Sequence, residues 1–113
     1  MDKLTKYRQI IRKILSDFVA LDARQPVPGM ESFLIADEQS DSYLWMNLGW
    51  EGERRTCGAT VYVRIRNEKF YIEEDWTEGG IADDLLDAGV PKEDIVLAFH
   101  PPNMRQYTEF AAA

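Results

Sequence analysis

Residues 56–75 read TCGATVYVRIRNEKFYIEED, and this stretch decides the fold. Apolar and polar side chains alternate along residues 56–66, which is the period of a strand with one buried face. Asn67 and Glu68 separate this run from a second one, residues 69–75, and Asn tolerates the positive φ of a two-residue turn. The sequence therefore predicts a β-hairpin. Its apolar side is expected to hold Cys57, Ala59, Val61, Val63 and Ile65, and its polar side Thr56, Thr60, Tyr62, Arg64 and Arg66.

Two more strands are predicted before this hairpin and one long helix before them. Residues 32–37, SFLIAD, and 41–50, DSYLWMNLGW, are rich in strand-forming residues and are joined by a short reversal. Residues 2–21 carry apolar side chains at helical spacing, and the segment DARQPVPG at 22–29 ends that helix with two prolines and a glycine.

The region after Gly80 predicts short elements. Ile81 to Leu86 suit a brief helix that ends at Gly89, with Pro91 behind it. The apolar run IVLAF at 95–99 fits either a buried strand or an extended segment. Two prolines then favour a last helix over roughly residues 101–107.

These elements define an α+β fold in a single domain that spans residues 1–113. The helix has an apolar stripe and the sheet an apolar face, and packing one on the other buries both. We therefore expect an antiparallel β-sheet meander, with the long N-terminal helix and the short C-terminal helices packed mainly on one face.

Composition excludes several classes of protein. The chain has 113 residues with 20 Asp and Glu against 13 Lys and Arg, one Cys and one His. A single Cys excludes an internal disulfide, and one Cys with one His is too few for a zinc site. No segment is long and apolar enough to span a membrane, and no signal peptide is visible. With a single thiol, a reducing cytoplasm is the expected location. No cofactor is expected.

Two possible catalytic sites are weaker than their structural alternatives. Cys57 and His100 are the only nucleophile and base of the Cys–His type, but Cys57 is expected on the apolar side of its strand. Six acids crowd residues 73–84, yet they fall on different faces and elements, so a solvated acidic surface is favoured over a metal or catalytic site. We therefore expect a protein that is not an enzyme.

Aromatic residues on the sheet suggest a contact surface. The strand pairing is expected to place one set away from the Cys57–Ile65 side, and these are types enriched in protein–protein interfaces. Such a surface indicates a homo-oligomer, with a dimer favoured, or else the segment 95–110 folds over it. The candidate set is Tyr43, Trp45, Tyr62, Arg64 and Tyr71.

Charge is distributed unevenly along the chain. Residues 1–13 hold five basic side chains against Asp2, whereas residues 67–94 hold ten acids against Lys69 and Lys92. The acidic half is suited to a basic partner, and Glu73, Asp75 and Glu78 are its candidate contact residues. The basic helix could instead contact DNA, although a solvated helix face explains it more simply.

Three segments resemble the XisI family. They are DWTEGGIADDLLDAGVPKEDIVLAFHPPNMRQYTEFA at 75–111, MDKLTKYRQII at 1–11 and LGWEGERR at 48–55, so the likeness covers nearly the whole chain. The resemblance implies a small α+β fold and a role as an excision controlling factor for the fdxN element, in heterocyst development of nitrogen-fixing cyanobacteria. It also implies action beside XisH, which resembles an endonuclease, and it supplies no catalytic residue.

Together these observations predict a non-enzymatic accessory factor for programmed DNA excision. It would bind a XisH-like protein, or itself, through the aromatic sheet face or the acidic region. The alternative is a recombination directionality factor that contacts DNA through the basic N-terminal helix. A metal-dependent nuclease built around Asp75, Thr77 and Glu78 is the hypothesis with the least support from the sequence.

Overall fold

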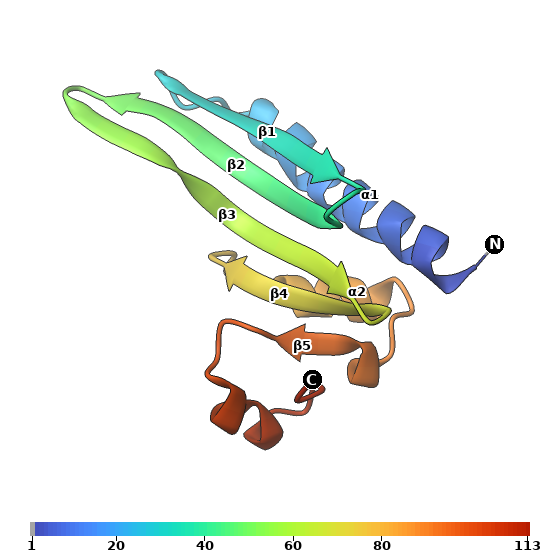
Figure 1. The fold of residues 1–113 in the computed structure, drawn as a ribbon. Helices are drawn as coiled ribbons and strands as arrows, with labels where there is room; N and C mark the ends of the chain where they lie inside the picture. The colour runs from blue at the N-terminus through green and yellow to red at the C-terminus, as the bar shows by residue number, and fades with distance from the viewer. Residues whose placement is uncertain (1) are drawn as a thin grey trace.

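The computed structural model describes residues 2–113 as nine elements around one sheet (Figure 1). The predicted helices and strands are confirmed, with ends that shift by a few residues. The elements in chain order are α1 Lys3–Ala23, β1 Met30–Asp37, β2 Ser42–Glu51, β3 Arg54–Arg66, β4 Lys69–Asp75, α2 Ile81–Asp87, the 3-10 helix η1 Lys92–Asp94, β5 Ile95–Leu97 and the 3-10 helix η2 Pro102–Tyr107.

The sheet is mixed, in the order β1-β2-β3-β4-β5. Strands β1 to β4 form the predicted antiparallel meander, and Asn67 and Glu68 form the predicted turn with φ of 53° and 58°. Strand β5 instead runs parallel to β4. The first three residues of the ambiguous run at 95–99 therefore form a strand, because the α2 crossover returns the chain in the direction of β4.

Both helices lie on one face of the sheet, as predicted. Figure 1 shows α1 behind β1 and β2 and α2 behind β4, and we call this helix-covered side the inner face. In the described part of the chain, the opposite side, the outer face, carries no helix over β1 to β3. The segment after β5 lies beside the β5 edge, where the backbone N–H of Ala111 donates to the carbonyl of Ile95, so it does not cover that face.

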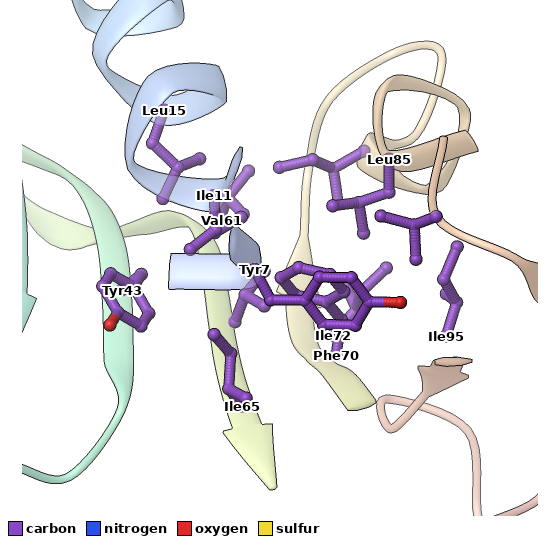
Figure 2. Close-up of a cluster of buried hydrophobic side chains, with 13 residues drawn as sticks. Tyr7, Ile11, Leu15, Tyr43, Val61, Ile65, Phe70, Ile72, Leu85 and Ile95 are labelled. Carbon is purple, nitrogen blue, oxygen red and sulfur yellow. The ribbon is translucent and has the colours of Figure 1, made fainter. Parts of the chain in front are cut away.

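Apolar side chains from every layer meet between α1, α2 and the sheet (Figure 2). Ile11 and Leu15 of α1 contribute fully buried side chains, and Leu85 of α2 and Ile95 of β5 close the far side. The ring of Tyr7 stacks on Phe70 with centroids 4.7 Å apart. The sheet contributes Tyr43, Val61, Val63, Ile65, Phe70 and Ile72.

Two register shifts change which residues face the core. Trp45 pairs with Val61 while Met46 pairs with Ala59, so Thr60 is an extra residue in β3. Such a β-bulge reverses the face of everything on one side of it. The unbroken alternation expected from 56 to 66 is therefore wrong, and Cys57 is exposed rather than on the apolar side. A second shift falls between Tyr62 and Val63, opposite Glu73 of β4.

A buried carboxylate in η1 connects the start of α1 to the C-terminal part of the chain. Asp94 is 7% exposed, and its Oδ2 accepts from Tyr7 Oη at 2.5 Å and pairs with Lys3 Nζ at 2.7 Å. Burial opposes ionisation of Asp94, but the hydrogen bonds from Lys3 and Tyr7 outweigh it and lower the pKa. Burial and the bond to Asp94 raise the pKa of Tyr7, which therefore stays a donor.

Removing this hydroxyl tests the tie. Tyr7→Phe keeps the ring on Phe70 but deprives Asp94 of a donor, and we expect a loss of roughly 1.5–3 kcal/mol in the free energy of unfolding. Urea unfolding measures it. Tyr71→Phe is the matched control, since Tyr71 lies on the outer face, and a change within about 0.5 kcal/mol is expected there. Equal losses in the two variants would contradict the assignment.

The lowered pKa of Asp94 also predicts a pH dependence. An unfolded aspartate titrates near about 3.9, so the folded carboxylate stabilises the protein above that pH and the contribution is lost as pH falls through the folded pKa. Asp94→Asn should therefore cost about 1–3 kcal/mol at pH 7 and less at pH 3, because pH 3 lies below the pKa of the unfolded aspartate. Asp83→Asn, at an exposed position of α2, should show no such convergence in chemical denaturation at the two pH values.

Candidate protein-binding surfaces

Two members of the predicted aromatic set lie inside the protein, so their expected placement is wrong. Tyr43 is 0% exposed and pairs with Val63, and cross-strand partners share a face. Trp45 pairs with Val61 and stacks on Phe18 of α1 with centroids 5.4 Å apart. The bulge at Thr60 is the reason. The prediction assumes regular alternation of faces from Cys57 to Ile65, and the extra residue reverses the face of the β2 residues opposite it.

The other three members lie on the outer face as predicted. Tyr62 pairs with Leu44, and Arg64 pairs with Tyr71, so all three share that side of the sheet. All are partly exposed. Arg64 Nε pairs with Glu73 Oε2 at 3.1 Å, which places Glu73 on the outer face as well. The role of Tyr62, Arg64 and Tyr71 as partner-binding residues stays a prediction.

The outer face also holds a larger apolar group outside the predicted aromatic set. Ile35 is 41% and Trp50 52% exposed, and the others are half-buried. The signal was present in YLWMNL at 43–48, where consecutive apolar residues make both faces of one strand apolar. The group comprises Phe33 and Ile35 of β1, and Leu44, Met46, Leu48 and Trp50 of β2.

The three acidic candidates occupy different positions. Glu73 is engaged by Arg64, and Asp75 holds the start of α2: its Oδ1 accepts from the backbone and hydroxyl of Thr77 at 3.0 and 2.6 Å, and its Oδ2 from Ile81 N at 2.6 Å. Of the three, only Glu78 is exposed. Asp75 is therefore a structural cap, which also explains why it does not form a nuclease-like cluster with Glu78.

An acidic surface nevertheless lies on α2 and the segment before it. Four carboxylates there form no ion pair within residues 2–113. Partial burial, followed by the charges of Asp87, Asp83 and Asp75, raises the pKa of Asp84. The neighbouring carboxylates therefore add to the effect of burial on this group. The acidic surface consists of Glu78, Asp83, Asp84 and Asp87, whereas Glu74 pairs with Tyr62 and lies on the outer face.

The basic residues of α1 are mostly neutralised. Lys3 pairs with Asp94, Arg8 with Asp41 at 2.8 Å, Arg12 with Glu38 at 3.8 Å and Lys13 with Asp17 at 2.9 Å. Of the five, only Lys6 is outside the ion pairs of residues 2–113. Counting charge along the sequence therefore overstates the positive potential that this helix offers to a phosphate backbone.

No further chemical site emerges from the described part of the chain. Within residues 2–113, no three His, Cys, Asp or Glu side chains are grouped to hold a metal ion. The ring of His100 lies 4.6 Å from that of Phe99 just after β5, whereas Cys57 lies on the outer face of β3. The helices of residues 2–113 are all too short or too polar to cross a membrane.

A helix-backed mixed sheet with one open face and an acidic helix surface defines a small single-domain α+β protein. The XisI family model matches residues 1–112, and the chain belongs to the XisI family. A comparison with curated proteins found no match.

Two solved structures from Anabaena variabilis ATCC 29413 are similar to the chain. The fdxN element excision controlling factor XisI is 44% identical, with a TM-score of 0.84, over 99% of this chain and 100% of that one. A XisI-like protein is 34% identical, with a TM-score of 0.91, over 97% of this chain and 99% of that one. These structures confirm the predicted fold class.

The corrected placement of Trp45 can be tested directly. Trp45→Ala removes a ring packed between β2 and α1, and we expect a loss of about 2–4 kcal/mol in the free energy of unfolding. Tyr62→Ala, on the outer face of β3, should cost about 1 kcal/mol or less. Thermal and urea unfolding of both variants measure the difference, and the reverse order would contradict the assigned faces.

Proposed function

We propose that this protein is a non-enzymatic excision controlling factor that acts by binding a XisH-like, endonuclease-like protein. Family membership and the 44% identical factor named for fdxN element excision support the first part. The second part draws on the surfaces of the fold, where exposed side chains are arranged for contact.

The acidic surface around α2 is the observation that carries this proposal. Its four carboxylates have no pairing cation within residues 2–113, and Asp84 has a raised pKa because of burial and its acidic neighbours. A basic surface of a DNA-acting partner would relieve this repulsion and would be attracted at long range. Binding there would also compete with the partner's own contact to DNA phosphates.

The alternative, a directionality factor that contacts DNA through α1, has less support. Such a factor needs several free cations on one helix face to displace counterions from DNA. Four of the five basic residues in the first turns of α1 are instead paired with acids of this chain. The geometry therefore favours the protein-binding function.

Charge reversal separates these functions. Glu78→Lys with Asp87→Lys should weaken capture of the purified XisH-like protein at least about tenfold, since each loses an attraction and gains a repulsion. Lys at position 87 also suits the last turn of α2, so the fold should be kept. Glu51→Lys with Glu53→Lys, at the β2–β3 turn, changes net charge equally and should leave capture unchanged.

Two results would overturn the proposal. One is undiminished capture by the Glu78→Lys, Asp87→Lys variant when circular dichroism shows it folded. The other is tight, steeply salt-dependent binding of the wild-type protein alone to DNA of the element borders in a mobility-shift assay, which the directionality factor predicts.

A further inference from the structure

The outer face of β1 to β3 is organised into three parallel stripes of different character. The middle stripe, on β2, is apolar and consists of Leu44, Met46 and Leu48. The β1 stripe has Glu31 and Asp37 at its two ends, with Phe33 and Ile35 between them. The β3 stripe has Arg55 at one end and Arg66 at the other, around Ala59 and Tyr62, with Arg64 beside Arg66 and paired with Glu73 of β4.

An apolar centre with charged margins is the anatomy of a protein interface. Within residues 2–113, no segment covers these strands on this side, because both helices lie on the inner face and the C-terminal segment lies beside β5 (Figure 1). Leaving such a stripe in water is unfavourable, and sheets with an apolar outer face are commonly packed against a second sheet.

The order of the stripes specifies the occupant. A two-fold axis along β2 would lay β2 on β2 and set the acidic β1 of each copy over the basic β3 of the other. Asp37 would then face Arg64 of the second copy, and Glu31 would face the neighbourhood of Arg55 and Cys57. An axis across the strands would set β1 on β1 and oppose like charges, so only the first arrangement is complementary.

We propose that the outer face of β1 to β3 is a self-complementary interface that binds a second copy of this chain through a two-fold axis along β2. The acidic surface around α2 belongs to the other side of the molecule and stays free in this dimer. The inference therefore stands independently of the partner proposed above.

Removing the apolar centre is the first test. Light scattering of the wild-type protein across a concentration series from about 1 to 100 µM should reach the mass of two chains, as expected of a modest interface. Met46→Lys puts two ammonium groups on the axis and should give the mass of one chain throughout. Met104→Lys, at an exposed methionine of η2, is the matched control and should dimerise as the wild type does.

A charge exchange tests the orientation. Glu31→Arg alone and Arg55→Glu alone should each weaken the dimer about tenfold, and the double variant should restore it, because the pairing is reciprocal. Cys57 supplies an independent readout. Its exposed thiol should react with a maleimide several times more slowly at dimer-forming concentrations than when dilute, and in Met46→Lys the rate should not depend on concentration.

Three outcomes would overturn the inference. They are a wild-type mass of one chain at every concentration, a dimer that persists in folded Met46→Lys, and no recovery in the Glu31→Arg, Arg55→Glu double variant. A persisting dimer would place the contact elsewhere, such as the unpaired edge of β1. None of these variants alters Glu78 or Asp87, so the result is separate from the test of the XisH-like partner.

Discussion

One extra residue in β3, Thr60, determines what each side of the sheet presents. Because Trp45 and Met46 pair with Val61 and Ala59, Thr60 has no partner in β2 and the strand changes face there. The bulge is held on two sides: Asn47 Nδ2 donates to the Thr60 hydroxyl, and the backbone N–H of Trp76 donates to its carbonyl at 2.8 Å. Tyr43 and Trp45 thereby join the core, and Cys57 comes to the surface.

Sequence reasoning recovered the elements and the antiparallel meander because helical and strand periods are local properties. It could not locate the bulge, since Gly58, Ala59 and Thr60 suit a regular strand as well as an irregular one. The faces predicted for Cys57 and Ala59, and for Tyr43 and Trp45 opposite the bulge, were therefore reversed, whereas those of Tyr62, Arg64 and Tyr71 were right. The parallel pairing of β5 was also out of reach, because a three-residue apolar run takes its direction from the crossover and not from its own composition.

The candidate surfaces show a similar division between what local sequence indicates and what tertiary contacts decide. The acidity of residues 67–94 could be read from the sequence. In the structure, Asp75 caps α2 and Glu73 pairs with Arg64, so the unpaired carboxylates are those at α2. Most basic side chains of α1 are likewise paired with acids, and one of these acids, Asp94, is distant in the sequence. Net charge per segment thus located the correct half of the chain but not the residues that remain available.

The bond from Tyr7 to Asp94 joins positions 87 residues apart. The hairpins between β1 and β4 close over short loops, whereas this bond and the pairing of β5 with β4 require the chain beyond residue 94. Contacts of such separation form slowly because loop closure must precede them. During synthesis, we expect α1 and the meander to assemble first. The contacts of Asp94 with Lys3 and Tyr7 can form only after residue 94 has left the ribosome.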